Sequence, residues 1–159
     1  MKRFIISLLL LTSSDFLHAQ MGSTPDQCIT RYGKPEREAI KTSGLLYFRT
    51  ERLCYIAHFY RNHCDVLSIF SNRSPMGIPE GLSEEQIADL LQSEGSGPGW
   101  TPVERFSING VWNSPDSRSF AIYDTMRHKL VIMTRDSYKR EKKALESTRQ
   151  TTKLVAPPE

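Results

Sequence analysis

Four polar side chains that could take part in chemistry lie close together near the middle of this sequence: His58, Tyr60, His63 and Asp65. They stand on either side of Arg61-Asn62, which we interpret as a tight turn between two strands, because asparagine tolerates the left-handed backbone that such turns require. With this turn, His58 pairs with Asp65 and Tyr60 with His63. All four side chains then share one face of a β-hairpin.

Two imidazoles and a carboxylate are ligands that zinc accepts, so His58, His63 and Asp65 form a candidate metal site. Such a site would make the protein a small secreted hydrolase or another metal-dependent enzyme. The sequence has no paired-cysteine zinc motif, no His-Glu-x-x-His spacing and no nucleophile elbow or phosphate-binding loop. We therefore favour a cross-strand His–Asp pair on an exposed face, and we expect no enzyme activity, no bound metal and no cofactor.

Three cysteines follow the predicted leader, at Cys28, Cys54 and Cys64. On the hairpin register given above, Cys64 lies opposite Phe59 and Cys54 lies opposite Ile69. Cys54 and Cys64 then point to opposite faces of the sheet, so they cannot bond with each other.

The partner of Cys64 follows from the face that it occupies. That face carries the more apolar residues of the hairpin: Ala57, Phe59, Cys64, Val66 and Phe70. We expect it to pack on the first helix, where Cys28 points inward. The prediction is a Cys28–Cys64 disulfide, with Cys54 left as a thiol. Closing the loop from residue 28 to residue 64 in this way would contribute about 3–4 kcal/mol on the chain-entropy model.

The helix that presents Cys28 has a start signal and a stop signal. Thr24 and Gln27 have the spacing of a capping box, in which each side chain bonds the backbone N–H of the other residue. Cys28 and Tyr32 are four positions apart and therefore share one face of the helix. Gly33 ends it, because glycine adopts the left-handed conformation that most residues avoid.

A second copy of this pattern begins at Gly81, with the same spacing and no gap. Ser83 takes the place of the cap, Gln86 closes the box, and Ile87 and Leu91 form the apolar face. Cap, box and both face positions agree, so we interpret the two segments as an internal repeat.

The pattern Gly-x-Thr-x-x-x-apolar-x-x-x-Leu/Tyr-Gly-x-Pro, from Gly22 to Pro35, resembles the opening helix of the SmpA/BamE-like and β-lactamase-inhibitor-protein-like superfamily. Cys28 stands where that family usually has an aliphatic residue. The resemblance implies a helical segment followed by an antiparallel sheet, twice over in the inhibitor. It also implies binding through the concave sheet face rather than catalysis, and it leaves an envelope-assembly accessory protein as a further alternative.

Runs rich in aromatic and β-branched residues predict the strands. They cover Leu45–Thr50, Leu53–Tyr60, Cys64–Ser71, Trp100–Phe106, Val111-Trp112, Ser119–Tyr123 and Leu130–Thr134, with a turn at Asn109-Gly110 and a flexible loop at Gly95–Gly99. We group them as a helix plus about three strands in each half. The predicted fold class is α+β, with two tandem α-β-β-β repeats that form an antiparallel sheet of about six strands and helices packed on one face.

Four segments follow from these patterns. Residues 1–19 have the charged, apolar and small-residue order of a signal peptide cleaved near Ala19, so we expect a periplasmic or secreted protein. Residues 20–74 and 75–136 are the two repeats. Residues 137–159 are a polar helix, up to Gln150, followed by a disordered tail. No segment beyond the leader is apolar enough to span a membrane.

Composition agrees with a soluble domain, since 38% of residues are hydrophobic and 25% are charged. The net charge of +3 is small, and we predict no nucleic-acid partner. The sequence thus favours an exported, non-enzymatic domain that binds a protein partner through an open sheet face. The residues expected to make contact are Tyr60, His58, His63 and Trp112, the last from an aromatic-rich second half.

Overall fold

The computed structural model describes residues 21–36, 44–72, 80–106 and 109–155. The predicted signal peptide, the cleavage site near Ala19 and most of the linker expected before the second helix lie outside the described residues. No helix in the described part of the chain is long and apolar enough to cross a membrane.

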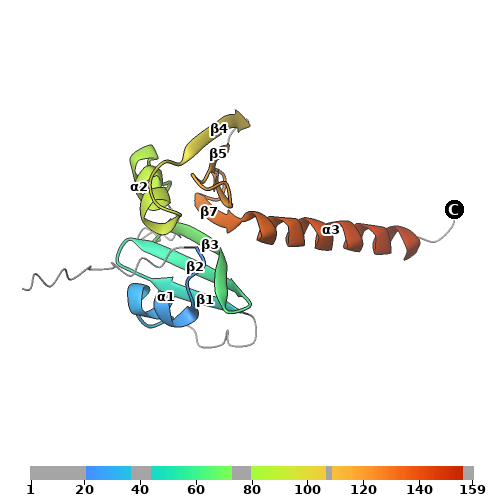
Figure 1. Cartoon of the computed structure of the whole chain (residues 1–159), viewed down its shortest axis with the longest axis horizontal. Helices are drawn as coiled ribbons and strands as arrows, with labels where there is room; N and C mark the ends of the chain where they lie inside the picture. Colours follow the sequence, from blue (N-terminus) through green and yellow to red (C-terminus); the bar gives the residue numbers. More distant parts are fainter. Residues whose placement is uncertain (1–20, 37–43, 73–79, 107–108, 156–159) are drawn as a thin grey trace, which may run out of the picture.

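Three helices and seven strands make up the described fold (Figure 1). In chain order they are α1 (Pro25–Tyr32), β1 (Leu45–Arg49), β2 (Leu53–Tyr60), β3 (His63–Ser71), α2 (Glu84–Glu94), β4 (Thr101–Phe106), β5 (Asn109–Asn113), β6 (Ser119–Asp124), β7 (Lys129–Thr134) and α3 (Arg135–Val155). The strands form one sheet in the order β1-β2-β3-β7-β6-β5-β4. Every neighbouring pair is antiparallel.

The fold class α+β is confirmed, but two tandem repeats with about six strands is wrong. The structure has a single seven-stranded sheet, because β3 pairs with the last strand, β7. Four strands follow α2, whereas three follow α1. The seven runs predicted as strands all form strands, but grouping them as about three in each half was wrong, and Asn109-Gly110 belongs to β5 instead of forming a turn.

Both predicted capping boxes are present. At the start of α1, Gln27 Oε1 accepts from the Thr24 backbone N–H at 2.8 Å, and Thr24 Oγ1 accepts from the Gln27 N–H at 3.4 Å. At the start of α2, the equivalent distances between Ser83 and Gln86 are 2.8 and 3.2 Å. Local sequence therefore sets where both helices begin.

The core lies between the sheet and the two helices α1 and α2. It contains Cys28 of α1, Ile87, Leu90 and Leu91 of α2, and the strand residues Phe48, Tyr55, Ala57, Cys64, Leu67, Ile69, Ala121, Tyr123, Leu130 and Ile132. Alternate residues of each strand point to the opposite face. We call that opposite face the open face.

The C-terminal helix α3 takes a different course from the other two. Figure 1 shows it leaving the sheet at the end of β7 and projecting away from the rest of the molecule. Its residues from position 141 to 147 are all exposed. The prediction ended this helix at Gln150, but the helix continues to Val155.

Candidate functional site

The open face carries a row of directly paired residues that crosses the whole sheet. In strand order the row is Tyr47, Ile56, Ser68, Val131, Ile122, Val111 and Val103. All seven are half-buried, and five of them are aliphatic. Paired β-branched side chains stabilise a sheet through their mutual contacts. They also present a largely apolar surface on this side of the sheet, which Ser68 interrupts at β3.

A β-bulge sets the position of the polar residues beside this row. The β2–β3 pairing shifts between His58 and Phe59, so that His58 faces Val66 and Cys54 faces Phe70. The pairings of Tyr60 with His63 and of Phe59 with Cys64 are as predicted. Asp65 is the extra residue of the bulge.

The bulge changes which side chains of β3 face the helices. The sequence placed Val66 and Phe70 on the helix side with Cys64, but the core contains Leu67 and Ile69 instead. The expected pairing of Cys54 with Ile69 is therefore wrong. The physical reason is the side-chain period of two, since a shift of one residue exchanges the two faces of a strand.

His58 and Asp65 remain in contact across the bulge. His58 Nδ1 lies 3.1 Å from Asp65 Oδ1, and Asp65 is only 6% exposed. The other oxygen, Asp65 Oδ2, forms an ion pair with Arg140 of α3. Each oxygen of the buried Asp65 carboxylate therefore has a partner, His58 for one and Arg140 for the other, as expected for a buried charge.

Tyr60 lies at the same end of the open face and contacts α3. The Arg140 guanidinium lies 3.9 Å from the centroid of the Tyr60 ring, and the Arg61 guanidinium lies 5.3 Å from it. Tyr60 nevertheless remains 42% exposed. The cluster of His58, Tyr60, Asp65 and Arg140 therefore joins α3 to the rim of the open face. Arg140 was not among the residues predicted to make contact, because it lies 75 residues from Asp65 in the chain.

His63 does not join this cluster. Its Nδ1 lies 2.8 Å from the backbone oxygen of Gly22, in the segment that leads into α1. The described residues contain no group of three histidine, cysteine or acidic side chains able to hold a metal ion. His58, His63 and Asp65 are therefore not arranged as one ligand set.

Trp112 lies on the other face of the sheet. It packs against the core and lines a hollow of about 210 Å³ beside α2, together with Ala88, Leu91 and Trp100. Trp112 faces Ala121, whose side chain is also in the core. The structure therefore separates Trp112 from His58 and Tyr60, which the sequence had placed on one surface with it.

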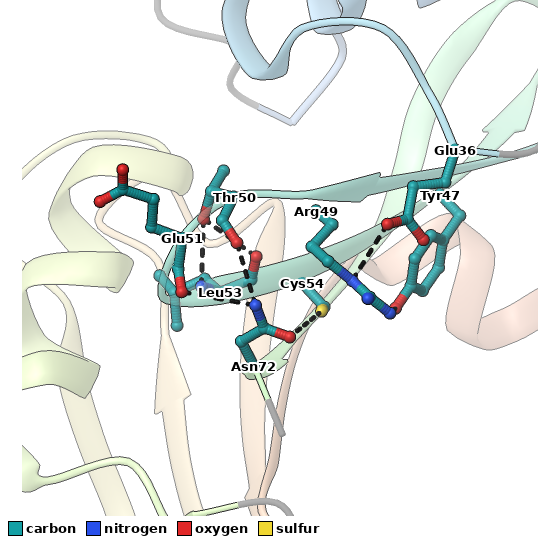
Figure 2. A network of polar contacts seen from close by, with 8 residues as sticks. All are labelled: Glu36, Tyr47, Arg49, Thr50, Glu51, Leu53, Cys54 and Asn72. Atoms are coloured by element: carbon teal, nitrogen blue, oxygen red, sulfur yellow. Dashed lines mark hydrogen bonds and ion pairs between the residues drawn. The ribbon is translucent and has the colours of Figure 1, made fainter. Parts of the chain in front are cut away.

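Figure 2 shows the polar network at the opposite end of the open face. Asn72, just after β3, donates from Nδ2 to the backbone oxygens of Thr50 and Glu51 at 3.2 and 3.4 Å. Its Oδ1 accepts from Cys54 Sγ at 3.7 Å. The side chain of Asn72 thus fastens the β1–β2 turn to the end of β3 and gives the buried Cys54 thiol a partner.

A hollow of about 650 Å³ lies next to this turn, between it and α2. Its lining includes the charged residues Glu51, Arg52, Glu80 and Asp89. Residues 73–79 link two of its lining residues, Asn72 and Glu80, and lie outside the described residues. We assign no ligand to this hollow.

A buried carboxylate connects the two helices on the core side. Glu94 of α2, 4% exposed, accepts from Arg31 at 2.9 Å and from the Tyr32 hydroxyl at 2.5 Å. Tyr32 also stacks on Tyr55, with ring centroids 4.4 Å apart. Burial, followed by the charge of Glu94, raises the pKa of Tyr55 to about 12, and the same two causes raise the pKa of Tyr32.

Comparison with known proteins gives a distant structural likeness and no match in sequence. No family model and no curated protein matches this sequence. Among solved structures, the chain is similar to a cysteine-rich secretory protein from Staphylococcus aureus, with a TM-score of 0.40 and 10% identity. The match covers 74% of this chain but only 45% of that one, so the chain spans less than half the length of that protein. A likeness of this size assigns neither a family nor an activity.

Proposed function

We propose that this protein is an exported, non-enzymatic domain that binds a partner protein through the open face of its sheet. The observation that supports the proposal is the row from Tyr47 to Val103. It is apolar at most positions, it crosses all seven strands, and it lies on the face opposite α1 and α2. Large apolar surfaces that are left accessible commonly serve as protein-binding sites.

The course of α3 supports the same proposal. Its first turns contact the residues that border the row, since Tyr138 packs edge-on against Phe120 and Arg140 lies over Tyr60. Residues 141–147 of the helix are exposed, so this part of α3 does not pack across the row itself. The partner would then meet an apolar centre with a polar, charged border, an arrangement typical of protein interfaces.

Tyr60 and His58 belong to this border and are the polar contacts that we propose. Tyr60 combines an exposed ring with two nearby guanidinium groups, which gives it the character of residues that contribute strongly to binding. Trp112 takes no part in the proposal because it faces the core.

The proposal is tested by capture from an envelope extract with three matched baits of residues 20–159. One bait is the parent, one carries Ile122→Glu in the middle of the row, and one carries Met126→Glu. Met126 is 80% exposed in the β6–β7 turn, so it provides the same charge change away from the open face.

A single partner captured by the parent and by Met126→Glu, but lost by Ile122→Glu, is the expected result. Circular dichroism and the midpoint of unfolding must show that Ile122→Glu remains folded. Retention of the partner by the folded Ile122→Glu protein would place binding elsewhere. Turnover of an envelope substrate by the purified protein would replace binding with catalysis.

A further inference from the structure

Two buried thiols meet where α1 packs on the sheet. Cys28 is the only buried residue of α1, at 2% exposure, and Cys64 at the start of β3 is 3% exposed. Both are free thiols in the same core cluster, and the Cys64 thiol donates to the backbone oxygen of Val66 at 3.6 Å. The backbone holds them in this position, because Gly22 N–H donates to Cys64 O and Cys64 N–H donates to Ser23 O, both at 2.8 Å.

The third cysteine is kept apart from this pair. Cys54 lies on the other face of β2 from Ala57 and Phe59, and its thiol donates to Asn72 Oδ1. The sheet itself therefore stands between Cys54 and the pair. Of the three cysteines, only Cys28 and Cys64 are placed to react with each other.

We propose that Cys28 and Cys64 are a disulfide-forming site, which is oxidised when α1 opens transiently and which then fastens α1 to β3. The oxidant is a low-molecular-weight or protein disulfide. The Cys28 thiolate attacks one sulfur of that disulfide, which forms a mixed disulfide and releases the other sulfur as a thiolate. The Cys64 thiolate then attacks the Cys28 sulfur and releases the second thiolate of the oxidant. Two protein thiols are oxidised, one external disulfide is reduced, and the two protons pass to the released thiolates.

Opening of α1 controls the reaction because neither sulfur is accessible in the closed fold. A buried thiol reacts slowly with an external disulfide. The helix has eight residues, and helices this short depend on packing and capping for their stability. When α1 moves away, Cys28 moves with it and becomes accessible, and its return brings the mixed disulfide to Cys64.

The site is independent of the proposed binding function. Cys28 and Cys64 lie on the helix side of the sheet, whereas the row from Tyr47 to Val103 lies on the open face. Oxidation in vitro also requires no export. The two proposals can therefore fail separately.

The test starts from the fully reduced, full-length protein in a buffer of reduced and oxidised glutathione. Samples are quenched in acid, alkylated under denaturing conditions and mapped by mass spectrometry. We expect a Cys28–Cys64 crosslink and an alkylated Cys54. Three alkylated cysteines at equilibrium, a stable glutathione adduct at Cys28, or a bridge that contains Cys54 would each overturn the proposal.

Opening of α1 is tested with two equivalent cap variants. Thr24→Ala removes the cap of α1, and Ser83→Ala removes the same kind of cap from α2. We expect Thr24→Ala to speed crosslinking by about fivefold. Loss of a typical cap raises the population of the state in which α1 is open by about that factor. Ser83→Ala should leave the rate unchanged. Equal rates in all three proteins, or equal acceleration by both variants, would overturn control by α1.

Discussion

Arg140, in the second turn of α3, forms an ion pair with Asp65, the extra residue of the β-bulge in β3. The guanidinium of Arg140 also lies over the ring of Tyr60, at 3.9 Å from its centroid. Asp65 is buried, while the Arg140 side chain is 37% exposed. These contacts fix the direction in which α3 leaves the sheet.

Replacement of Arg140 by methionine should lower the free energy of unfolding by about 1–3 kcal/mol. The substitution keeps much of the packing but leaves the buried Asp65 carboxylate without its guanidinium partner. Chemical denaturation measures the loss, and hydrogen exchange should show faster exchange in the first turns of α3. Lys142→Met, at an exposed position, is the control. Equal effects from both variants would mean that the ion pair does not anchor the helix.

Glu94→Gln should destabilise the protein by about 1.5–3 kcal/mol, because it weakens charge-assisted hydrogen bonds from Arg31 and Tyr32 between α1 and α2. Tyr32→Phe removes only the hydroxyl contact and should cost about 1 kcal/mol. Urea unfolding of both variants measures the difference. A larger loss from Tyr32→Phe than from Glu94→Gln would contradict this order.

Stability should fall in alkaline solution as Tyr55 loses its proton. Its pKa is raised to about 12 in the folded protein, so the folded state holds this proton more tightly than the unfolded state does. The resulting stabilisation is complete below about pH 10 and is lost as the pH rises through about 12, with a total of about 2.7 kcal/mol. The raised pKa of Tyr32 acts in the same direction.

Urea midpoints between pH 8 and pH 12 measure this loss, and tyrosinate absorbance follows the ionisation itself. Tyr55→Phe should flatten the dependence on pH. Tyr138→Phe is the control, because Tyr138 is 48% exposed on α3. If the urea midpoint of the Tyr55→Phe protein falls with pH as steeply as that of the parent, ionisation of Tyr55 is not the cause of the lost stability.

Gly95→Ala should destabilise the protein by about 1–3 kcal/mol, the usual cost of overpacking. A Cβ atom at this position would lie 2.3 Å from the Trp100 ring and 2.5 Å from the backbone oxygen of Leu91. Thermal unfolding measures the change, with Ser96→Ala as the neighbouring control. A stable Gly95→Ala protein would show that the contact between Gly95 and Trp100 is loose.

The features that sequence predicted correctly depend on neighbours in the chain. The two capping boxes form within one turn of helix, between Thr24 and Gln27 and between Ser83 and Gln86. Arg61-Asn62 forms the predicted turn, with positive φ angles of 50° and 67°. The end of β2 and its pairing with β3 next to that turn follow from the same local signals.

The candidate site was predicted in part, because its residues come from segments far apart in the sequence. His58, Tyr60 and Asp65 were identified from the hairpin alone, whereas Arg140 joins them from a distance of 75 residues. Trp112 was assigned to the wrong face, because the face that β5 turns to the core is set by its pairing with β6, where Trp112 faces Ala121. The glycine-rich segment from Gly95 to Gly99 is a loop, as predicted, but its first residue lies close against Trp100, which the sequence did not indicate.

By itself, the sequence determined where α1 and α2 begin, most of the strands and the separation of Cys54 from Cys64, since each depends on chain periodicity or on contacts within a few residues. Only the tertiary structure decided the bulge at Asp65, the pairing of β3 with β7 and the direction of α3. Those features result from contacts between distant segments. A shift of one residue at the bulge exchanges the two faces of the rest of β3, and packing against the whole core selects the face that is buried.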